Sequence, residues 1–82
     1  MDQQNTPDKP VLERITELVH EEQRLYGHAS LTDQDQARLR EIQVSLDQCW
    51  DLLRQRRARR EFGQDPDDAK VRPAAVVEGY EQ

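Results

Sequence analysis

The chain has 82 residues, of which 34% are hydrophobic and 35% are charged, and its formal net charge is −5. A chain of this size and composition is too small for a large catalytic core or a deep cofactor cavity, so we expect neither an enzyme nor a bound cofactor. It has no apolar run long enough to span a membrane and no secretory signal at its start, and with one cysteine we expect a cytoplasmic protein.

The first predicted element is an amphipathic helix near the N-terminus. Residues 1–7 are polar, and we expect them to form a flexible tail. Over residues 9–26 apolar side chains recur at helical spacing, which predicts a helix with Asp8 as its N-cap. Gly27 follows, and we expect this glycine to end the helix in the left-handed conformation.

The second predicted helix carries the strongest pattern in the sequence, an apolar heptad that ends in arginine. Its positions are spaced alternately by three and four residues: Leu39, Ile42, Leu46, Cys49, Leu53, Arg56 and Arg60. Thr32 and Asp35 have the spacing of a capping box at the start, and Phe62 followed by Gly63 is typical of a helix end. These signals predict a helix over residues 33–61.

A short connection makes the two helices antiparallel neighbours, which predicts an all-α helical hairpin over residues 8–63. Counted from the turn, Leu18 faces Ile42 and Ile15 faces Leu46. The helices are ~27 Å and ~43 Å long at 1.5 Å per residue. The second helix should therefore extend beyond the first by several turns.

The C-terminal part, residues 64–82, is predicted to form a short helix and a tail. Asp65 followed by Pro66 resembles a helix start, and Pro73 limits that helix to about two turns. The tail has apolar residues with which it can fold back onto the hairpin: Val71, Val76, Val77 and Tyr80.

A lone hairpin buries only one face of each helix, so the open apolar surface needs a cover. The docked tail is one possibility. The other, which we favour, is a homodimer in which two hairpins form a four-helix bundle. The expected oligomer seam consists of the apolar heptad positions Leu39, Ile42, Leu46, Cys49 and Leu53.

Five arginines fall within seven positions near the end of the second helix: Arg54, Arg56, Arg57, Arg59 and Arg60. Together with Trp50 and Leu53 they are the candidate partner-binding residues, on an overhang that we expect to begin near Leu52. We favour a structural or self-interaction role for them, with the acidic C-terminal segment as one partner. The alternatives are an acidic protein partner and nucleic-acid phosphates, although no aromatic residues interleave with the arginines for base stacking.

The sequence contains no recognisable catalytic or metal-binding constellation. His20 and His28 are eight residues apart and lack the spacing of a helical ligand pair, so we expect no metal. No nucleophile elbow or glycine-rich phosphate loop is present. Cys49 lies on the seam, where a buried and inert thiol is expected, and an intersubunit disulfide is conceivable if a dimer axis passes nearby.

One stretch resembles a known family. Residues 49–67, CWDLLRQRRARREFGQDPD, are similar to the signature of a small actinobacterial family of unknown function, and the segments around Val71 and Tyr80 resemble the end of its members. The resemblance implies a bacterial, cytosolic setting and brings no activity or cofactor with it. We therefore expect a small, self-associating helical interaction module.

Overall fold

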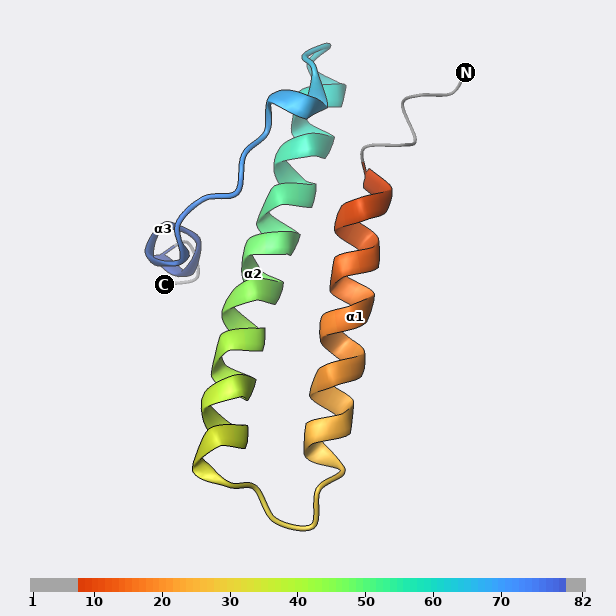
Figure 1. Cartoon of the computed structure of the whole chain (residues 1–82). Helices are drawn as coiled ribbons and strands as arrows, with labels where there is room; N and C mark the ends of the chain where they lie inside the picture. Colours follow the sequence, from red (N-terminus) through yellow and green to blue (C-terminus); the bar gives the residue numbers. More distant parts are fainter. Residues whose placement is uncertain (1–7, 80–82) are drawn as a thin grey trace.

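The computed structural model describes residues 8–79 and shows an all-α molecule built around one long helix (Figure 1). Its elements are α1 (Asp8–Tyr26), α2 (Asp33–Glu61), a 3₁₀ turn η2 (Pro66–Asp68) and α3 (Ala74–Gly79). Helices α1 and α2 run antiparallel, and the segment with η2 and α3 lies on the other side of α2 from α1. The predicted all-α hairpin with a docked C-terminal segment is confirmed, whereas the predicted tail over residues 1–7 lies outside the described residues.

The core lies between α1 and α2. Ile15, Leu18, Ile42 and Leu46 form one buried cluster, which confirms the two predicted facing pairs. Other apolar side chains pack around it and are partly buried: Val11, Val19, Leu25, Cys49 and Leu53. Each fully buried aliphatic side chain contributes ~1.5–3 kcal/mol, so this cluster is the main stabilising contact of the hairpin.

The residues predicted as an oligomer seam lie largely inside a single chain. Leu39, Ile42 and Leu46 are buried without any second copy, and Cys49 and Leu53 are partly buried against the core. Most of the heptad surface is therefore used within the hairpin. A second chain would have to bind elsewhere or open the hairpin.

Both ends of α2 lie where the sequence predicts them. The hydroxyl of Thr32 accepts from the backbone N–H of Asp35 at 3.0 Å, and the Asp35 carboxylate accepts from the backbone N–H of Thr32 at 3.1 Å. At the other end Gly63 has φ +72°, and the N–H of Gln64 donates to the carbonyl of Arg59 at 2.7 Å. This is a Schellman motif, in which the left-handed residue costs glycine little.

The end of α1 differs from the prediction. Among the described glycines only Gly63 has a positive φ, so Gly27 is not a left-handed cap. Its N–H still donates to the carbonyls of Gln23 and Arg24, both at 3.1 Å. The helical bonding therefore continues through Gly27, and the chain reverses over the residues that follow.

Helix α2, with 29 residues against the 19 of α1, extends beyond the start of α1 as predicted (Figure 1). Asp8 is the first residue of α1 and not its N-cap, and its carboxylate binds Arg56 at 2.7 Å and Arg60 at 2.8 Å. Arg56 and Arg60 continue the heptad that faces α1, and their long side chains reach the acidic start of that helix. The overhang is therefore present, but Arg56 and Arg60 on it are already bound to the shorter helix.

The C-terminal segment is more extended than predicted. The helix expected after Asp65 is one 3₁₀ turn instead of two α-helical turns, although Asp65 caps it by accepting from the N–H of Asp67 at 2.9 Å. Within the docked segment Ala69 and Val77 are buried, whereas Val71 and Val76 are exposed. Tyr80 lies outside the described residues.

Candidate functional site

The five clustered arginines have different roles in the structure, and Arg56 is the most deeply placed. It is 6% exposed, and its guanidinium donates to Asp8, to the carbonyl of Pro66 at 3.0 Å and to Asp67 at 3.0 Å. Burial opposes the charge on Arg56, but the bonds from Asp8 and Asp67 outweigh it and raise its pKa. The hydrogen bond from Arg60 is the main reason that the pKa of Asp8 is lowered. We refer to Asp8, Arg56, Arg60, Pro66 and Asp67 as the Arg56 cluster.

A second buried charge holds the C-terminal segment. Asp51 is 1% exposed and accepts two bonds from the Arg72 guanidinium, which are the main reason that its pKa is lowered. The amide of Gln55 donates to Asp51 at 2.9 Å and to the carbonyl of Lys70 at 2.8 Å. Gln48 donates to the carbonyl of Arg72 at 3.1 Å. These five residues form the Asp51 cluster.

No motif in the sequence points to the Asp51 cluster. Its signal is a polar stripe: Gln48, Asp51 and Gln55 are spaced by three and four residues and share one side of α2. This side is turned away from the heptad that packs on α1. A second polar face on a long helix is usually solvated, so the pattern alone does not indicate a docked segment.

Four of the seven candidate partner-binding residues meet at the surface. Trp50, Leu53, Arg54 and Arg57 line a hollow of about 100 Å³ on α2. Trp50 is 46% exposed, and within residues 8–79 neither Arg54 nor Arg57 makes a side-chain hydrogen bond or an ion pair. The other three arginines are used inside the chain, because Arg56 and Arg60 bind Asp8 and Arg59 donates weakly to Gln64 at 3.4 Å.

Leu12 of α1 lies on the same side of the hairpin and is 48% exposed. The facing pairs place Leu12 at about the same height along the hairpin as Trp50. Because a helix turns by 100° per residue, both side chains lie on the same broad side of the antiparallel pair. The Cα extents are 48 × 31 × 14 Å, so the molecule is one helix layer thick. We define the open face by Leu12 with Trp50, Leu53, Arg54 and Arg57.

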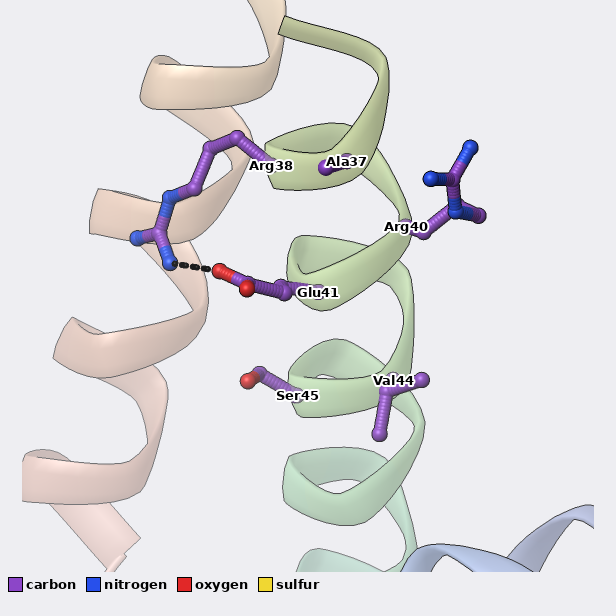
Figure 2. A pocket seen from close by; sticks show the side chains of 6 residues that line it. All are labelled: Ala37, Arg38, Arg40, Glu41, Val44 and Ser45. Atoms are coloured by element: carbon purple, nitrogen blue, oxygen red, sulfur yellow. Dashed lines mark hydrogen bonds and ion pairs between the residues drawn. The ribbon is translucent and has the colours of Figure 1, made fainter. Parts of the chain in front are cut away.

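A wider depression lies on the part of α2 near the turn (Figure 2). It measures about 600 Å³ and is lined by Ala37, Arg38, Arg40, Glu41, Val44 and Ser45, all from one helix. Arg38 points toward α1 and Arg40 away from it (Figure 2). Arg38 binds Glu21 at 2.6 Å and Glu41 at 3.2 Å, and its bond lowers the pKa of Glu21. Because its main cation is already paired, this surface is a weaker candidate than the open face.

Metal binding, thiol chemistry and membrane insertion are the other properties that the sequence raises. Residues 8–79 contain no group of three or more His, Cys, Asp or Glu side chains placed to hold a metal ion. Cys49 is partly buried, and this burial raises the pKa of its thiol, which keeps it protonated and unreactive. None of the described helices combines the length and the apolar character needed to cross a membrane.

Comparison with known proteins agrees with the family resemblance of residues 49–67. Uncharacterised proteins of Mycobacterium bovis and of two strains of Mycobacterium tuberculosis are each 51% identical to this chain over 77 residues. The alignments cover 89% of this chain and 88% of each relative. No solved structure matches the chain. The family model described as protein of unknown function (DUF2630) matches residues 7–82, and the chain therefore belongs to that family.

Proposed function

We propose that this protein is a non-catalytic binding module that binds another polypeptide chain through the open face. The observation that carries the proposal is a half-exposed tryptophan beside Arg54 and Arg57, which make no side-chain hydrogen bond or ion pair within residues 8–79. Tryptophan and arginine are the residue types that contribute most to protein–protein binding, especially around a small apolar hollow. On the open face Trp50 and Leu53 supply the apolar contact, and Arg54 and Arg57 supply the charge.

The rest of the molecule supports this role as a scaffold. The Arg56 cluster ties the start of α1 and η2 to α2, and the Asp51 cluster ties the segment before α3 to the same helix. A surface that is already ordered loses little conformational entropy when it binds. In this proposal the module works in the bacterial cytoplasm, which suits the unpaired Cys49.

Nucleic acid is the less favoured partner. Of the five clustered arginines, Arg56 and Arg60 are neutralised by Asp8, and Arg59 donates to Gln64. The other two, Arg54 and Arg57, which make no ion pair in the described part of the chain, correspond to about two phosphate contacts and a salt slope of about −1.8, which is small for a nucleic-acid-binding protein. The number of available cations therefore favours a protein partner.

The test is site-specific photo-crosslinking in cells that naturally produce the protein. A photo-reactive residue replaces Arg54 in the full chain, and a matched variant carries it at Gln34, an exposed position at the start of α2. We expect light-dependent protein adducts from position 54 that are lost when Trp50→Ala is added, and none from position 34. Adducts that nuclease removes, or equal adducts from both positions, would contradict the proposal.

A further inference from the structure

We infer that the occupant of the open face is a second copy of the chain. Two hairpins pack broad side to broad side about a two-fold axis that passes at the level of Leu12 and Trp50. This inference rests on the proposed function and names its partner. It also places the dimer contact on a different surface from the predicted heptad seam.

The first argument is the shape of the molecule. With a thickness of 14 Å between Cα extremes, residues 8–79 form a single layer of helices, and none of them covers a broad side of the hairpin. Leu12 and Trp50 are each about half exposed at the centre of one such side. A second hairpin supplies the two helices that complete a four-helix bundle, which is the usual way to cover an exposed helical pair.

The second argument is the order of charges around Trp50. Asp47 precedes Trp50 by three residues and Arg54 follows it by four, and neither makes an ion pair within residues 8–79. A two-fold axis through Trp50, perpendicular to the helices, runs the two α2 helices antiparallel. It brings Asp47 of each copy to Arg54 of the other, as an isologous interface requires.

The charges further from the two-fold axis are complementary as well. Gln43 and Arg57 are both seven residues from Trp50, on opposite sides of it. The amide of Gln43 donates to the carboxylate of Glu22, so this bond places a negative charge beside Gln43. The same axis brings Arg57 of one copy to this carboxylate of the other, and no like charges meet along α2.

The mixed charge of the surface also argues against a uniformly acidic partner. An acidic segment that runs along α2 from Arg57 past Arg54 would next meet Asp47 and then the Glu22–Gln43 pair. Like charges placed opposite one another at an interface cost affinity. A second copy whose α2 runs antiparallel places the opposite charge against each of these positions.

The available area is sufficient for a reversible dimer. The paired part of the hairpin is ~28 Å long and ~20 Å wide, which gives ~560 Å² before the relief of the side chains is counted. Specific interfaces bury ~800 Å² on each partner, and weaker ones bury less. We therefore expect a dimer with a dissociation constant in the micromolar range.

The decisive experiment is sedimentation equilibrium of the full chain with two charge-reversal variants. Asp47→Arg and Arg54→Asp should each weaken the dimer at least tenfold, because each places like charges opposite one another twice. An equal mixture of the two variants should form a heterodimer, since every contact then pairs opposite charges. Glu41→Arg is the control and should dimerise like the wild type, because Glu41 is exposed and lies about 120° or more around α2 from Asp47 and Arg54 at 100° per residue.

Three outcomes would overturn the inference: a wild-type chain that keeps its 9.7 kDa monomer mass at millimolar concentration, a dimer that survives Trp50→Ala, or single variants that mix without association. Circular dichroism of each variant shows whether the helices remain intact, so that an unfolded variant is not counted. If the chain is monomeric but position 54 still crosslinks to a different protein, the proposed function stands and the second-copy inference fails. If no protein adduct forms at all, both fail.

Discussion

Two charged side chains, Arg56 and Asp51, lie inside this small molecule, and each has every buried polar atom satisfied. A buried ion pair gains little over an apolar pair, but removing one partner leaves an uncompensated charge. Their contribution is therefore mainly to fix one arrangement of the chain. Arg56 joins α2 to Asp8 and Asp67, and Asp51 joins it to Arg72.

At this scale the first prediction compares two neighbouring arginines. Arg56→Met should lower the free energy of unfolding by ~1.5–2 kcal/mol, because it removes the hydrogen bonds to Asp8, Asp67 and the Pro66 carbonyl, while Arg60 still pairs with Asp8. Arg57→Met, at an exposed position without a partner within residues 8–79, should change it by less than ~0.5 kcal/mol. Urea denaturation followed by circular dichroism measures both, and equal effects would contradict the role of the Arg56 cluster.

The second prediction concerns acid stability. The pKa values of Asp8 and Asp51 are lowered from the ordinary 3.8, chiefly by Arg60 and Arg72 respectively. A lowered folded pKa gives stability that is fully present above the unfolded value and is lost as the pH falls through the folded value. Stability attributable to these groups should thus be constant from pH 7 to about 5 and decline below about pH 4. Asp51→Asn should flatten this decline in thermal melts, and an unchanged pH profile would contradict it.

At the scale of elements, α2 is the helix to which the others attach. It contacts α1 on its heptad face, and it contacts η2 and α3 on other faces. The C-terminal segment adds few apolar contacts, and its attachment depends largely on the Asp51 cluster and on the buried Ala69 and Val77. Its removal exposes the Asp51 carboxylate and the helix side beneath it.

The third prediction is a truncation. Deleting residues 71–82 removes Arg72 and Val77 and should lower the thermal midpoint by ~10 °C, on the basis of ~4–8 °C per kcal/mol for a chain of this size. The α1–α2 core should remain helical, because Ile15, Leu18, Ile42 and Leu46 are untouched. Deleting only residues 80–82 is the control and should leave the midpoint nearly unchanged. If the chain without residues 71–82 has the same thermal midpoint as the full chain, the segment contributes no stability.

The sequence predicts the elements that depend on local signals. The Thr32–Asp35 capping box and Gly63 define the ends of α2, and the apolar spacing defines the register of Ile15 with Leu46. Gly27 differs from the prediction because a glycine after a helix is only sometimes left-handed. Local rules therefore recover most of the hairpin.

The charged contacts were harder to predict because they join distant residues. Asp8 is 48 residues from Arg56, and Asp51 is 21 residues from Arg72. In a chain in which 35% of the residues are charged, many other pairs look equally plausible. The spacing of Trp50, Leu53, Arg54 and Arg57 does place them on one flank, but it does not show which arginines remain free.

At the scale of the whole molecule, the thin hairpin makes Trp50 a natural reporter. It is the single tryptophan of the chain, and it lies at the centre of the open face. Any partner that covers this face changes the solvent around the indole. Association can therefore be followed without a label.

The fourth prediction uses this property. As the wild-type concentration rises from about 1 μM to about 1 mM, across the micromolar dissociation constant expected for a specific pair, Trp50 emission should move to shorter wavelength and iodide should quench it less. A variant with Trp50→Phe and Phe62→Trp places the indole at the 79% exposed position after α2 and should show no such change. Concentration-independent emission from Trp50 would contradict the dimer.

The Arg56 cluster also has a consequence for how the molecule comes apart. One guanidinium holds the first residue of α1 and, through Pro66 and Asp67, the chain that leaves α2. If the start of α1 detaches, Arg56 loses Asp8 and holds η2 less firmly, and detachment of η2 weakens the hold on α1 in the same way. We therefore expect the start of α1 and η2 to detach together. Amide protons near residue 10 and near residue 67 should exchange with solvent as one cooperative group, although more than fifty positions of chain separate them.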